Sequence, residues 1–163
     1  HGDPLQADTS LAPMAREDLR DELHEQVQRS IEQGAVALCG CHPIEVGAFY
    51  EASVIDQVKP GVAAYDEELF GPVAIIIRVD TVDQAIAVAN GSRYGLGGSV
   101  WTNDTEMGEQ IALQIESGAV FVNGMVKSDP RLPFGGVKAS GYGRELCHHG
   151  MHEFMNAKTV WIK

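Results

Sequence analysis

The chain has 163 residues, of which 44% are hydrophobic, and a formal net charge of −11 at pH 7. This length is sufficient for a buried core, whereas the acidity and the lack of any cluster of Lys or Arg exclude nucleic acid as an expected partner. No stretch of about 18 apolar residues could span a membrane and no signal peptide opens the chain, so no membrane partner is expected.

Helix and strand patterns alternate along the chain, beginning with an amphipathic helix over residues 16–34. Leu19, Leu23, Val27 and Ile31 recur at every fourth position and form one apolar stripe on this helix. The elements expected after it are, in order, strands 35–39, 49–58 and 72–80, helix 82–92, strand 96–102, helix 103–118, strand 119–125, a helix from about residue 144, and strand 158–163.

Strand 35–39 is expected to be buried, and strand 72–80, apolar on both faces, is typical of a central strand in a covered sheet. Thr81 and Asn103 stand at the N-cap positions of the helices that follow them, each with Glu or Gln three residues later. Strands that alternate with helices predict an α/β fold with a largely parallel sheet, in one domain with a strand-like tail.

The stretch EELFGPV, residues 67–73, places two adjacent carboxylates before a sharp turn at Gly71 and Pro72. A carboxylate offers only hydrogen-bond acceptors, which suits it to the two hydroxyls of a ribose. One carboxylate could face solvent while the other binds a ligand, and a pair of solvated charges at a loop is the alternative.

A second stretch, PFGGVKASGYGRE over residues 133–145, contains Gly135, Gly136, Gly141 and Gly143. Glycines allow close backbone approach, so the loop could cradle an anion or could be a tight structural loop. It contains neither G-x-G-x-x-G after a strand nor G-K-[ST], and the pattern alone favours the structural interpretation.

Histidines and cysteines offer weaker signals. His148 and His152 have the i, i+4 spacing that could bind a metal, but without a third regularly spaced ligand we expect surface histidines and no metal site. Cys39 and Cys41 flank a glycine and do not form a C-x-x-C redox motif. Three cysteines in all do not suggest a disulfide framework and fit a reducing compartment, so cytoplasmic localisation is expected.

Taken together, several ordered stretches resemble the C-terminal half of the aldehyde dehydrogenase family. The matching segments are GDPL…DTSLAPM, with Ala12 where the family has Gly, then EELFGPV, ANGSRYGLGGSVWTND, GAVFVNG and PFGGVKASGYGRE. This resemblance implies a Rossmann-like, largely parallel sheet with flanking helices. It implies that residues 1–157 are the C-terminal part of the catalytic domain and 158–163 an oligomerisation strand, hence a homo-oligomer.

The resemblance also assigns roles to residues. Glu68 is implied to bind the nicotinamide ribose of NAD or NADP, Phe70 to pack beside the nicotinamide, and Phe134 to line the pocket of an aldehyde substrate. The family's nucleophile stands in a G-Q-x-C motif, which this chain lacks, and the general-base Glu is absent too. No catalytic residue is therefore expected in this chain, and it should be inactive alone.

The loop NGMVKSDPRLPFGG, residues 123–136, resembles that of succinate-semialdehyde dehydrogenases in particular. Ser128 and Arg131 are the residues that could bind a substrate carboxylate, with a surface charge as the alternative for Arg131. The competing hypothesis for the whole chain is a non-catalytic binding or oligomerisation module built on the same fold. The choice between NAD and NADP, and the size of the oligomer, are left open.

Overall fold

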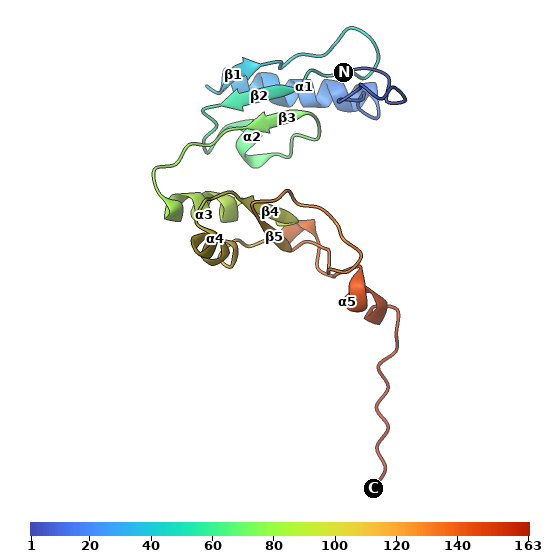
Figure 1. The fold of residues 1–163 in the computed structure, drawn as a ribbon. Helices are drawn as coiled ribbons and strands as arrows, with labels where there is room; N and C mark the ends of the chain where they lie inside the picture. Colours follow the sequence, from blue (N-terminus) through green and yellow to red (C-terminus); the bar gives the residue numbers. More distant parts are fainter. The chain divides into compact units, whose positions relative to one another are not determined.

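The computed structural model describes all of residues 1–163, and helices and strands alternate along most of them (Figure 1). The chain divides into two units, His1–Val79 and Asp80–Lys163, and each has a sheet of its own. The predicted α/β class is confirmed. No helix in the structure combines the length and the apolar character that crossing a bilayer requires.

The first unit has a three-stranded sheet in the order β1-β2-β3, with β1 antiparallel and β3 parallel to the central strand. Two helices accompany it, and the longer one matches the amphipathic helix expected from the sequence. The elements are α1 Glu17–Glu32, β1 Val36–Cys39, β2 Ser53–Asp56, α2 Ala63–Asp66 and β3 Val73–Ile75.

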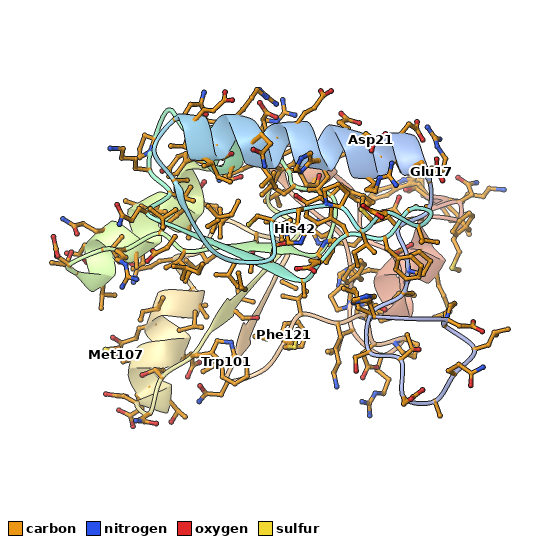
Figure 2. The ribbon with its side chains drawn as sticks, turned by 90° about the horizontal axis from the view of Figure 1, so that it is seen from above. Glu17, Asp21, His42, Trp101, Met107 and Phe121 are labelled. Carbon is orange, nitrogen blue, oxygen red and sulfur yellow. The ribbon has the colours of Figure 1, made fainter.

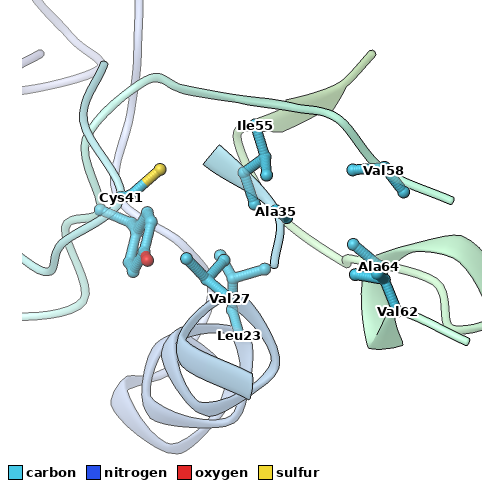
Figure 3. Close-up of a cluster of buried hydrophobic side chains, with 9 residues drawn as sticks. Leu23, Val27, Ala35, Cys41, Ile55, Val58, Val62 and Ala64 are labelled. Carbon is cyan, nitrogen blue, oxygen red and sulfur yellow. The ribbon is translucent and has the colours of Figure 1, made fainter. Parts of the chain in front are cut away.

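The core of this unit lies between α1, α2 and the sheet (Figure 3). Leu23 and Val27, the middle of the predicted stripe, are 1% and 0% exposed. Ile55 from β2 is likewise fully buried against this cluster. The opposite side of α1 carries exposed acids such as Glu17 and Asp21, one turn apart (Figure 2). The apolar stripe therefore fixes which face of α1 packs.

Two predictions of strand burial were wrong. All four residues of β1 are exposed, and β3 has only three residues, of which Ala74 and Ile75 are exposed. Both strands are edges of the sheet, and only β2 lies between two neighbours. An apolar run indicates a strand but does not indicate its place in the sheet. The edge position of residues 72–80 could therefore not be predicted from their composition alone.

The second unit contains a two-stranded parallel sheet in which Ser99 pairs with Phe121. Its helices and strands follow the predicted order as far as the last helix, and an additional 3-10 turn lies within the glycine-rich loop. The elements are α3 Val82–Gly91, β4 Gly97–Val100, α4 Thr105–Ala112, β5 Ala119–Val122, the turn Lys138–Ser140 and α5 Cys147–His152.

One of the two predicted helix caps is confirmed and the other is shifted by one residue. The Thr81 hydroxyl accepts a hydrogen bond from the Gln84 amide at 3.2 Å, as expected. In α4 the cap is Asp104 rather than Asn103, and its carboxylate accepts from the Met107 amide at 2.9 Å. A charged acceptor at the N-terminus also interacts favourably with the helix dipole, which favours Asp over the neighbouring Asn.

The C-terminal part differs most from the predictions. The last helix begins at Cys147 rather than near Arg144, because Glu145 pairs with Phe134 through two backbone hydrogen bonds of 2.7 and 2.9 Å. Residues 156–163 form no strand within the chain. A strand requires a neighbour, and no other segment of this chain pairs with the tail. Its pairing in an oligomer, and the boundary at residue 158, stay predictions.

Candidate functional site

The two adjacent carboxylates after α2 have different surroundings. Glu67 is the C-cap of α2, and its carboxylate accepts two hydrogen bonds from Arg29, at 3.0 and 2.8 Å. The Gln26 side-chain amide donates a third, at 2.9 Å. The Arg29 guanidinium, followed by the Gln26 amide, lowers the pKa of Glu67 below its ordinary value. Glu67 is therefore a charged anchor between α2 and α1.

Glu68, by contrast, has an exposed carboxylate with no hydrogen-bond or ion-pair partner in the chain. Only its backbone carbonyl is held, by the Gln26 amide at 3.3 Å. Glu68 borders a small hollow of about 70 Å³ together with Phe70 and residues of α1. An unpaired carboxylate on a fixed backbone fits the requirement for binding a sugar diol, since all its acceptor positions are available.

Phe70 lies at the corner that follows, and its side chain is 71% exposed. The corner packs closely on α1, because a Cβ atom added to Gly71 would lie 2.4 Å from Leu23 Cδ2. Phe70 also borders an apolar hollow of about 300 Å³ with Met14 and Leu19. The exposed ring beside an apolar hollow is suited to contact with a flat, uncharged group.

The predicted substrate residues belong to the second unit and do not all lie together. Phe134 is half-buried, and both its amide and its carbonyl are bound to Glu145. Phe134 and Arg131 border the same open hollow of about 1000 Å³, together with Leu146. Ser128 is exposed and does not line this hollow. The loop thus places the aromatic ring and the guanidinium on one surface, and the hydroxyl apart from it.

Arg131 already has a carboxylate partner within its own loop. Its Nε and Nη2 groups donate to Asp129 at 2.9 and 2.6 Å, and its backbone amide donates to the same carboxylate at 2.9 Å. These bonds lower the pKa of Asp129 to about 2. Sequence reasoning missed Asp129, although the D-x-R spacing was visible. Three of the five guanidinium N–H groups, including both on Nη1, remain available for a second anion.

The glycine-rich loop is closely packed, as the structural interpretation expects. A Cβ atom at Gly118 would lie 1.6 Å from the Gly135 carbonyl oxygen, so the two backbones touch. The Val137 amide donates to Gly95, and Arg144 donates to the carbonyls of Gly136 and Gly143 at 2.9 and 2.8 Å. The Val137 amide and the Arg144 guanidinium are thus occupied by carbonyl groups of the chain, and Phe134 is held separately by its two backbone bonds to Glu145.

The cysteines and histidines form no second site. All three cysteines are free, and burial raises the pKa of the Cys41 thiol, which disfavours the thiolate. The rings of His148 and His149 are 4.1 Å apart, and those of His148 and His152 are 5.9 Å apart. No group of three or more His, Cys, Asp or Glu residues in the chain is arranged to hold a metal ion.

Comparison with known proteins agrees with the motifs. Residues 1–160 match the Aldehyde dehydrogenase family. The chain is 47% identical to succinate semialdehyde dehydrogenase [NAD(P)+] Sad of Escherichia coli K12, covering 98% of this chain and 35% of that protein. It is 46% identical to a probable succinate-semialdehyde dehydrogenase [NADP(+)] of Synechocystis, over 99% of this chain and 36% of the relative.

The structure resembles crystal structures of the same kind of enzyme. The succinic semialdehyde dehydrogenase of Streptococcus pyogenes in complex with NADP+ matches with a TM-score of 0.95 and 37% identity, over 99% of this chain and 36% of that chain. The chain thus spans about a third of the length of the relatives it matches. On the family match and the identity across nearly all of its residues, the chain belongs to the aldehyde dehydrogenase family.

Proposed function

We propose that residues 1–163 form the ribose-binding corner and one wall of the substrate pocket in an NAD(P)+-dependent aldehyde dehydrogenase. The observation that carries this proposal is the division of roles between the two carboxylates. Glu67 is anchored to α1, whereas Glu68 is unpaired beside an exposed Phe70. Replacing Glu68 in the full-length enzyme and measuring hydride transfer and cofactor affinity tests it.

In the proposed reaction an aldehyde is oxidised to a carboxylic acid. Bound NAD(P)+ supplies the hydride acceptor. Glu68 accepts hydrogen bonds from the ribose hydroxyls and so orients the cofactor, while Phe70 limits the movement of the nicotinamide ring. None of the three cysteines stands in the family's G-Q-x-C motif, so the attacking thiolate would belong to a segment outside these residues. After hydride transfer, water would hydrolyse the thioester, supplying the second oxygen of the acid and releasing the thiolate.

We propose succinate semialdehyde as the substrate. Two relatives that are 46–47% identical carry that name, and a semialdehyde with a terminal carboxylate needs a positive or hydrogen-bonding group at its far end. Arg131 retains free N–H groups although Asp129 occupies part of its fork. Ser128 is accessible in the same loop.

Replacing Ser128 and Arg131 together by Ala in the full-length enzyme should raise KM for succinate semialdehyde by about tenfold. The expected effect is at the lower end of the range for hydrogen bonds to charged groups, because the Arg131 side chain is exposed and is shared with Asp129. Steady-state kinetics with succinate semialdehyde and with an uncharged aldehyde of similar length measure it, and KM for the uncharged aldehyde should stay constant.

Lys127 provides the matched control, because it is an exposed cation in the same loop that acts on Asp129 only through its charge and forms no hydrogen bond or ion pair with a carboxylate. Its replacement by Ala should leave KM for both aldehydes close to that of the parent enzyme. If the double variant raises KM equally for the charged and the uncharged aldehyde, recognition of a substrate carboxylate by this loop is wrong.

We propose further that the tail pairs with a second copy of the protein. Val160, Trp161 and Ile162 are 71%, 85% and 90% exposed, a large apolar surface for eight residues without secondary structure. Removing residues 158–163 should therefore lower the molar mass measured by light scattering. The same mass with and without the tail would exclude this role.

A further inference from the structure

One face of α1 carries polar side chains that all reach α2 or the loop after it. Gln26, Arg29, Ser30 and Gln33 follow the i, i+3, i+4, i+7 spacing that places residues on a single face. Ser30 is fully buried, although it is polar. A buried hydroxyl needs hydrogen-bond partners, and the partners of this face are all backbone or side-chain groups of residues 63–68 or of α1 itself.

The beginning of α2 is capped by α1 and not by its own N-cap residue. Val62 occupies the N-cap position and provides no side-chain hydrogen bond. The amide of Ala63 instead donates to Gln33 Oε1 at 2.7 Å, and that of Ala64 to Ser30 Oγ at 2.9 Å. These are the first-turn amides that a helix cannot satisfy internally, so α1 supplies the missing acceptors.

The end of α2 is fastened to the same helix. The two parallel hydrogen bonds from Arg29 to Glu67 fix the orientation of the carboxylate as well as its distance. Gln26 donates both to Glu67 and to the carbonyl of Glu68. A helix of four residues has little stability of its own, so its place depends on these contacts with the 16-residue α1.

We propose that Arg29, through Glu67, is a positioning residue that sets the place of Glu68 for binding the cofactor ribose. This inference rests on the proposed role of Glu68. The Arg29 and Glu67 side chains are 50% and 37% exposed, and exposed ion pairs add little to global stability. Their effect is therefore local: the pair fixes the residue that directly precedes the unpaired carboxylate.

Replacing Arg29 by Ala in the full-length enzyme should weaken binding of NADPH or NADH by about 3- to 10-fold, the loss expected for an oriented hydrogen-bonded pair. Titration of the enzyme with NADPH or NADH, followed through the fluorescence of the cofactor, measures this affinity without turnover. The melting temperature should change little. The cofactor affinity of Arg29→Lys should lie between that of the parent enzyme and that of Arg29→Ala, because an ammonium group cannot form the two parallel bonds.

A double variant separates positioning from a general loss of structure. Arg29→Glu combined with Glu67→Arg restores a pair of opposite charge, and it should recover part of the cofactor affinity that Arg29→Glu alone loses. Arg16, which directly precedes α1 and pairs only with Asp18, is the matched control. Its replacement by Ala should leave cofactor affinity at the parent value.

The outcomes distinguish this inference from the function on which it rests. If Glu68→Gln weakens cofactor binding but Arg29→Ala does not, the ribose-binding role stands and the positioning role is wrong. An equal loss in the Arg29 and Arg16 variants likewise overturns it, because the effect would then be nonspecific. If Glu68→Gln leaves cofactor affinity unchanged, the proposed function fails first, and the positioning role fails with it.

Discussion

Replacing Glu68 by Gln in the full-length enzyme should slow hydride transfer by about 10- to 150-fold. The substitution removes a charged acceptor of about 1.5–3 kcal/mol while it preserves the size of the side chain. The reason to expect a full effect is that Glu68 makes no competing contact in the chain that could replace the lost interaction. Single-turnover kinetics at saturating cofactor separate the chemical step from product release.

Asp66 offers a control for this experiment, because it is an exposed carboxylate only two residues earlier, at the end of α2. Asp66→Asn removes the same charge and should leave the rate of hydride transfer within about twofold, as for surface substitutions in general. Unchanged turnover together with unchanged cofactor affinity in Glu68→Gln would remove Glu68 from the site.

Replacing Gly118 by Ala should lower the free energy of unfolding of the second unit by about 1–3 kcal/mol or more. The new methyl group would lie 1.6 Å from the Gly135 carbonyl oxygen and 3.1 Å from that of Leu96. Both neighbours are backbone atoms, so no flexible side chain can move aside. Because Gly135 directly follows Phe134, the displaced backbone should also disturb the aromatic wall of the substrate pocket. Chemical denaturation followed by circular dichroism measures the loss.

Gly143 lies in the loop that Gly118 contacts, but a Cβ atom added to it would have no other atom within 4 Å. Its replacement by Ala should change the free energy of unfolding by no more than about 0.5 kcal/mol. Equal stability of the Gly118 and Gly143 variants would show that the close contact between the two backbones has no energetic importance.

The sequence predicted the features that depend on local pattern. The stripe of Leu23 and Val27 identified the packed face of α1, and the Thr81 cap identified the start of α3. Burial of the strands could not be predicted in this way, because β1 and β3 owe their exposure to their positions at the edges of the sheet. Likewise, the pairing of Glu145 with Phe134, which delays the start of α5, joins segments that no local pattern connects.

At the candidate site the residue pattern identified a pair of carboxylates, and only the family resemblance singled out Glu68; the pattern alone did not tell which of the two is free. That distinction depends on Arg29, which lies 38 residues before Glu67 and meets it only in the folded chain. Ser128 and Arg131 were predicted to act together, whereas only Arg131 lines the hollow that contains Phe134. The partner missed here, Asp129, is a local one and could have been considered from its spacing.

The capping of α2 by side chains of α1 limits how this region can be exchanged between related enzymes. A chimaera that receives residues 62–70 without Gln26, Arg29, Ser30 and Gln33 would leave the first amides of the transplanted helix without acceptors. Each buried polar group without a partner destabilises a protein by about 1–3 kcal/mol. The long helix and the short one therefore constitute a single exchangeable module, with a crossover point before residue 17 rather than between them.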